Sequence, residues 1–213
     1  MEISNITRGT MNKMFSEGKR FDSRDLLDYR EVNITYDVSN KAEGSARVNI
    51  GKTEVVVGVK LGFGEPYPDS PDKGNLMCTA ELYPLASPRF EAGPPGFKAI
   101  ELGRMIDRAL RESGMIDFSK LCIKEGEKVW TVFVDIYTIN HDGNLLDAAG
   151  IAAVAALRQA KIPKYDAENE KVLFGELTEE SVPVQKENII QTTVHKIGNN
   201  LVLDPTLEEE DLS

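Results

Sequence analysis

Residues 129–161 constrain the fold most, because a strand, a polar turn and a helix follow one another there without a break. Apolar side chains alternate along residues 129–139, which predicts a strand with one buried face. That face is formed by Trp130, Val132, Val134 and Ile136. A helix is then expected from about Leu145 to Lys161, with Pro163 as its end. Its small side chains permit close packing against a sheet, and they are Ala152, Ala153, Ala155 and Ala156.

The turn between this strand and this helix has the outline of an anion-binding site. The first turn of a helix offers free N–H groups and the positive end of the helix dipole. A phosphate loop usually adds a cation to its Gly and Ser or Thr residues. Here the corresponding residues supply no cation, and they are Asn144, Leu145, Leu146 and Asp147. Asp147 suits the dipole but repels an anion. The segment alone therefore favours a capped strand-to-helix connection.

Further strands and one further helix are expected on both sides of this segment. Alternating apolar residues predict single strands at Val32–Tyr36 and Leu76–Tyr83. Between them, residues 46–61 are expected to form a hairpin that turns at Gly51-Lys52. A helix should run from Ala99 to about Ser113. Shorter strands are expected near Val172–Phe174, Asn188–His195 and Leu201–Leu203. Several strands precede the first good helix, which predicts an α+β fold, one domain with a mixed or antiparallel sheet.

Charge and cysteine content exclude several classes of protein. The formal net charge is −10, from 35 acidic and 25 basic residues, which argues against binding nucleic acid by general charge. A local basic strip is not excluded, because the field depends on how charges are distributed. Cys78 and Cys122 are interpreted as reduced core thiols, and no zinc pattern is present. No apolar run approaches the ~20 residues that span a bilayer, and no signal peptide opens the chain. A cytoplasmic location is expected.

One basic strip is a row of arginines within the predicted helix at residues 99–113. Spacings of four and three place Arg104, Arg108 and Arg111 on one helix face. Guanidinium groups match phosphate geometry well, so the row is a candidate anion contact. Alternatively, the row is a solvated face with ion pairs inside the helix, since Glu101 and Asp107 lie at pairing distance. Spacing alone slightly favours the solvated face.

Acidic residues gather near the C-terminus. They are Asp204, Glu208, Glu209, Glu210 and Asp211. Clustered carboxylates can bind Mg²⁺ or supply an acid or a base. Acidic termini are more often solvated, and that interpretation is favoured in the absence of a matching cation site.

Several segments, taken in order, resemble the RNase PH family of phosphorolytic exoribonucleases. They are RFDSR at residues 20–24 with Tyr29-Arg30, the first hairpin with Gly44 and Gly51, FEAGPPGFKAIELGRMIDRAL at 90–110, VWTVFVDIYTINHDGNLLDAAGIAAVAAL at 129–157, and LVLDPTLEEED at 201–211. Ser23 stands where the family's opening motif has Gly. The order and spacing are most like those of the non-catalytic RNase PH-like ring subunit of archaeal exosomes, a type for which the last segment is characteristic.

The resemblance implies paired β-α units and a phosphate site that has lost its chemistry. Active members carry Gly-Gly-Thr-Arg-Thr after the long strand, and its Arg and hydroxyls hold phosphate. Here Leu146 stands where that Arg should be, and the Arg pair ahead of the first helix reads Phe97-Lys98. Asp204 and Glu210 remain at positions resembling catalytic or metal-binding acids. Since phosphorolysis needs the phosphate held in line, no catalytic residue, metal or cofactor is expected.

The resemblance also implies partners. A subunit of this type pairs with a catalytic paralogue, three such pairs close a ring, and RNA-binding cap subunits join it. Single-stranded RNA is an expected binding partner. Arg104 and Arg108 match positions where the inactive subunit type is thought to grip the RNA backbone, with Arg111 and Lys98 as further candidates. The chain would then help to shape its partner's active site.

Two alternatives stay open at the level of sequence. One is a self-sufficient phosphorolytic exoribonuclease, against which Leu146 and Phe97 speak. The other is a structural ring module whose arginine row forms only ion pairs. Residues 1–28 are interpreted as an amphipathic lead-in and residues 29–213 as the RNase PH-like domain. Since the family pattern continues with further strands and a helix, that domain is expected to be incomplete at its C-terminal side.

Overall fold

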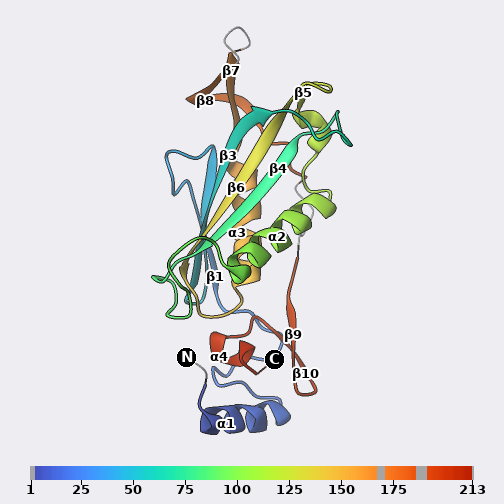
Figure 1. The fold of residues 1–213 in the computed structure, drawn as a ribbon. Coiled ribbons are helices and arrows are strands. Elements are labelled where there is room, and N and C mark those ends of the chain that lie inside the picture. Colours follow the sequence, from blue (N-terminus) through green and yellow to red (C-terminus); the bar gives the residue numbers. More distant parts are fainter. Residues whose placement is uncertain (1–2, 167–170, 186–190, 213) are drawn as a thin grey trace.

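A central sheet organises the chain, whose computed structural model describes residues 3–166, 171–185 and 191–212. The strand order is β1-β2-β3-β6-β4, and β5 pairs with β6 (Figure 1). All neighbours are antiparallel except β4, which runs parallel to β6. The strands are β1 (Val32–Tyr36), β2 (Gly44–Ile50), β3 (Thr53–Gly64), β4 (Asn75–Leu82), β5 (Cys122–Lys124) and β6 (Lys128–Asn140). The sheet is therefore mixed, as expected.

Two helices cover one face of this sheet. Helix α3 (Leu145–Gln159) lies against β2 and β3, and α2 (Phe97–Glu112) lies against β4. Their apolar sides join the buried sheet face in one core. The face predicted for β6 is confirmed, since Trp130, Val132, Val134 and Ile136 are all buried. The predicted hairpin and the predicted helix at residues 99–113 are confirmed as well. None of the helices in the described residues is long and apolar enough to cross a membrane.

The predicted end of the second helix is wrong. Helix α3 ends at Gln159, because Ala160 already has extended backbone angles, φ −65° and ψ 128°. Pro163 lies instead inside β7 (Lys161–Asp166), which pairs with β8 (Lys171–Ser181). The pairing register shifts on both sides of Pro163. A bulge of this kind tolerates a residue that has no N–H to donate.

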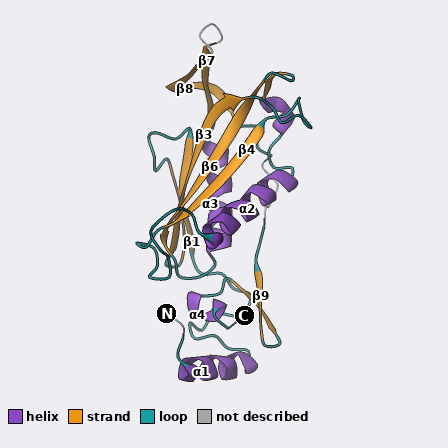
Figure 2. Ribbon diagram, in the orientation of Figure 1, coloured by secondary structure: helices purple, strands orange, loops and turns teal. Residues whose placement is uncertain are grey.

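The two ends of the chain pack together beyond one end of the sheet (Figure 2). Helix α1 (Asn5–Ser16) contributes Met11 and Phe15 to a small second core, which Ile197 and Val202 complete. These last two lie on a hairpin of β9 (Val194–Ile197) and β10 (Asn200–Leu203), followed by α4 (Leu207–Glu210). The predicted strand at 188–195 falls partly outside the described residues. The division of the chain at residue 28 stays a prediction.

Helix α3 approaches β2 so closely that one position has no room for a side chain. A Cβ atom on Gly44 would lie 2.6 Å from the backbone nitrogen of Ala160 and would also meet the carbonyl oxygen of Ala156. Both obstacles are backbone atoms, which cannot swing aside. The alanines of α3 and the glycine of β2 together set the distance between helix and sheet.

We expect Gly44→Ala to lower the free energy of unfolding by about 1–3 kcal/mol, because it overpacks this contact. The matched control is Gly58→Ala in β3, where an added Cβ would meet only the Ala42 side chain at 3.8 Å. Urea unfolding of both variants measures the difference. Equal loss in the two variants would contradict the close approach of α3 to β2.

Candidate functional site

The start of α3 lies directly under the C-terminal segment of the chain. Gly143 has φ +88°, and a Cβ placed on it would come within 2.5 Å of the backbone nitrogen of Leu207. Asn144 follows as the residue preceding the helix, in the left-handed region with φ 53°. Asn144 is buried although its side chain is polar. The turn that resembles a phosphate loop is therefore covered by α4 and the residues just before it.

Three carboxylates of the chain itself face the N-terminus of α3. The backbone N–H of Asn144 donates to Oε1 of Glu210 at 2.7 Å, and its side-chain Nδ2 donates to Oδ1 of Asp204 at 2.9 Å. Asp147, in the first turn, is also buried. It accepts from the hydroxyl of Tyr29 at 2.6 Å and from the N–H of Thr193 at 3.0 Å. The positive end of the helix dipole is already balanced by internal negative charge.

Asp204 is held by two arginines from the N-terminal segment. Its carboxylate accepts from Nη1 of Arg24 at 2.9 Å, and from Nε and Nη2 of Arg30 at 2.8 and 2.7 Å. The backbone N–H of Arg30 adds another bond at 2.8 Å. Burial acts to raise the pKa of Asp204, but the hydrogen bonds from Arg30 and Asn144 outweigh it and lower the pKa. The carboxylate is ionised and fully bonded, so it is placed as a structural counter-ion.

The interpretation of the acidic C-terminus as solvated is wrong for most of its residues. Glu209 is buried and pairs through both oxygens with Arg20, whose side chain is fully buried. Asp211 pairs with Arg89, with the two atoms Oδ2 and Nη2 at 2.7 Å. Only Glu208 is exposed. Within the described residues, no group of three or more His, Cys, Asp or Glu could hold a metal ion.

A cavity of about 370 Å³ lies between α2 and the start of α3. Apolar side chains form much of its wall, among them Leu82, Leu102, Leu145 and Leu146. Leu146, the residue that the resemblance places at the arginine position of active family members, therefore offers a hydrocarbon surface to this cavity. Glu210 also lines the cavity, and burial raises the pKa of this carboxyl even though the Asn144 N–H acts in the other direction.

The cations around this cavity are few. Lys98, His141 and His195 line it, and so do the acidic Glu101 and Glu210. Burial lowers the pKa of His195. Burial, assisted by Arg89 and Lys98, lowers the pKa of His141 to about 4. The imidazole is consequently neutral at pH 7 and adds no positive charge. Such a lining does not favour a phosphate dianion.

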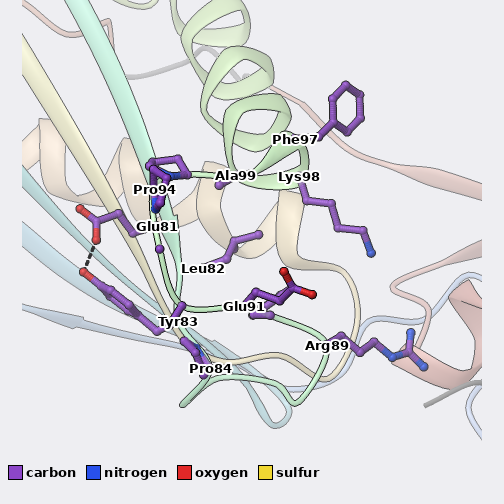
Figure 3. Close-up of a pocket in the computed structure, with 15 residues that line it drawn as sticks. Glu81, Leu82, Tyr83, Pro84, Arg89, Glu91, Pro94, Phe97, Lys98 and Ala99 are labelled. Carbon is purple, nitrogen blue, oxygen red and sulfur yellow. Dashed lines mark hydrogen bonds between the residues drawn. The ribbon is translucent and has the colours of Figure 1, made fainter.

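A second cavity, of about 700 Å³, lies beneath the loop that leads into α2 (Figure 3). Tyr83, Arg89 and Glu91 line it, and Lys98 is shared with the smaller cavity. In Figure 3 the side chains of Arg89 and Lys98 extend toward the same side, whereas Phe97 points outward from the first turn of α2.

The arginine row of α2 divides into two kinds of residue. Arg111 donates to Oδ1 of Asp107 at 3.0 Å and to the carbonyl oxygen of Leu76 at 3.1 Å. Arg104 and Arg108 are exposed, and neither has an ion pair or hydrogen bond with any residue that the structure describes. The pairing that Glu101 offers to Arg104 is thus not made. Two of the three guanidinium groups remain available to a ligand.

Comparison with known proteins identifies the family. Residues 28–163 match the RNase PH family model, described as "3' exoribonuclease family, domain 1". The chain belongs to the RNase PH family. The family expected from the sequence is thereby confirmed, and so is the single α+β RNase PH fold.

Relatives within the RNase PH family cover nearly all of the chain. It is 50% identical over 214 residues to exosome complex component Rrp42 of Thermococcus onnurineus. That match covers 99% of this chain and 78% of the relative. It is 46% identical over 210 residues to the protein of that name from Methanothermobacter thermautotrophicus. This match covers 99% of the chain and 77% of the relative. A chain of the Archaeoglobus fulgidus exosome with RNA bound to the active site matches with a TM-score of 0.88 and 46% identity. That match covers 98% of this chain and 79% of the other.

If Asp204 is a structural counter-ion, Asp204→Asn should destabilise the fold by about 3–5 kcal/mol, because two partly buried guanidinium groups lose the fully buried carboxylate that they share. The control Glu208→Gln changes an exposed carboxylate of α4 and should stay within about 0.5 kcal/mol of the parent. Urea unfolding at pH 7 measures both.

The same pair of proteins tests the pKa of Asp204. A carboxyl whose pKa is lowered by folding stabilises the protein above its unfolded pKa of about 3.9, and this contribution is lost as the pH falls through the folded value. The stability difference between parent and Asp204→Asn should therefore be full at pH 5–7 and shrink below about pH 4. A constant difference down to pH 2, or none at pH 7, would contradict the assigned role.

Proposed function

We propose that this chain is a non-catalytic subunit of the exosome, a phosphorolytic 3′→5′ exoribonuclease complex that degrades and processes RNA. In this role it binds RNA and helps to structure the active site of a catalytic RNase PH-like paralogue. The observation that carries the proposal is the carboxylate of Glu210 on the Asn144 N–H, at the point where the family's active members hold phosphate.

Phosphorolysis depends on holding the phosphate nucleophile in line with the bond that breaks. Leu146 cannot donate a hydrogen bond, and three carboxylates already surround the start of α3. Asp204 and Glu210, which resemble catalytic acids by position, are both engaged in internal bonds. These contacts favour the proposal of a subunit without its own activity, and they disfavour a self-sufficient exoribonuclease.

The names of the relatives support assembly. Proteins called exosome complex component are identical to this chain at about half of the aligned positions. We propose that the chain forms a heterodimer with a catalytic paralogue, that three heterodimers close a ring, and that cap subunits with RNA-binding domains join it in the cytoplasm. Closed rings arise naturally when each contact joins two different surfaces.

Arg104 and Arg108 are proposed as the RNA contacts of this subunit. Four residues of α-helix separate them, which corresponds to about 6 Å along the axis. Both are exposed and without a partner among the described residues. Two guanidinium groups at this spacing can hold successive phosphates of an extended strand without reading its sequence. Lys98 is a further candidate, and Arg111 is less suited because Asp107 holds it.

Activity should require both kinds of subunit. We expect no release of nucleoside diphosphates from this chain alone with RNA, Mg²⁺ and inorganic phosphate, and clear release after addition of its candidate RNase PH-like partner. In the same assembled complex, replacing both Arg104 and Arg108 by Gln should weaken RNA binding. The slope of log affinity against log salt should fall by about 1.4, as two lost contacts to a single strand predict.

Each competing function has its own outcome. The control Lys120→Gln with Lys124→Gln removes two exposed charges near β5 and should leave RNA binding unchanged. Phosphate-dependent decay by the chain alone would make it an enzyme in its own right. Unchanged RNA binding and decay by the Arg104 and Arg108 double variant would favour a structural module without RNA contact.

A further inference from the structure

Phe97 begins α2 and leaves its aromatic ring in solvent. The residue is 78% exposed, and in Figure 3 its ring points away from the other labelled side chains. It stands on a regular helix, since Phe97 is the first residue of α2, and the loop before it does not cover it. Single exposed apolar residues are common, so exposure alone indicates little. The position of this ring relative to charged neighbours is more informative.

Phe97 shares a helix face with the two unpaired arginines. At 100° per residue, Arg104 lies two turns after Phe97 and Arg108 three turns after it, all within an arc of about 40°. The rise of 1.5 Å per residue places Arg104 about 10 Å and Arg108 about 16 Å from Phe97 along the axis. One aromatic ring and two free guanidinium groups therefore form a line on a single rigid helix.

Glu101 lies on the same face, between Phe97 and Arg104, and is exposed. Its carboxylate would repel a phosphate at that point. A strand held by its phosphates over Arg104 and Arg108 must then present something other than phosphate at the start of the helix. A nucleobase meets this requirement, because its flat face stacks on an aromatic ring whatever its sequence.

We propose that Phe97 is a stacking platform for a base of single-stranded RNA whose phosphates are held by Arg104 and Arg108. The inference rests on the proposed function and names a further contact of the same surface. Charge complementarity favours RNA as the occupant: Arg104 and Arg108 place two unpaired cations beyond Glu101 on this line, in a chain of net charge −10. Ile100, 52% exposed, extends the apolar surface beside the ring.

The test compares two ligands of equal length, an oligoadenylate and an abasic sugar–phosphate oligomer, on the complex assembled with the RNase PH-like partner. Phe97→Leu keeps an apolar side chain but removes the aromatic face, and Phe97→Trp keeps that face. We expect Phe97→Leu to weaken oligoadenylate binding about 5- to 150-fold and to leave the abasic oligomer unaffected. Phe97→Trp should bind oligoadenylate at least as well as the parent.

The variant with both Arg104 and Arg108 replaced by Gln separates this inference from the proposed function. It should weaken binding of the oligoadenylate and of the abasic oligomer. If it does so while Phe97→Leu changes neither, the stacking role is wrong and the RNA-contact role stands. If neither variant changes binding, both fail. If Phe97→Leu instead prevents co-elution with the partner subunit and spares RNA affinity, the ring is a protein-docking contact, and the inference is overturned.

Discussion

The buried ion pairs of Asp204 tie together three distant parts of the chain. Arg24 and Arg30 come from the segment before the first strand, and Asn144 comes from the start of α3. A buried carboxylate without partners would be strongly unfavourable, so the position of Asp204 depends on all of these contacts being made. They fix the last residues over the turn after β6. The same geometry brings Glu210 to the Asn144 N–H, so the occupation of this N–H by an internal carboxylate follows from the packing of the fold.

The same contacts support the proposal that this chain lacks the phosphate site that the family resemblance implies at the start of α3. The arginines of the N-terminal segment point inward to the chain's own acids: Arg20 to Glu209 and Arg30 to Asp204. Tyr29 stabilises Asp147 in the first turn of α3. On the proposed function, the apolar Leu146 is thus only one of the features that disfavour a bound phosphate. Arg104 and Arg108 of α2, in contrast, lie exposed and without a partner among the described residues.

The local periodicity of the sequence predicts most of the fold but little of the candidate site. Alternation predicted the buried face of β6, and small residues predicted the close approach of α3, because both signals depend on near neighbours in sequence. The pairing of Arg20 with Glu209 joins residues 189 positions apart. No spacing rule connects such residues, so the acidic segment was interpreted as solvated. The left-handed backbone of Asn144 and the bulge at Pro163 depend in the same way on tertiary contacts.

The account depends on the start of α3 being closed to phosphate, and amide NMR during a titration with inorganic phosphate tests this directly. Occupation by the chain's own carboxylates predicts that the N–H signals of Asn144, Leu145 and Leu146 stay in place at millimolar phosphate. Saturable shifts centred on these three residues would show an open anion site and would contradict the account.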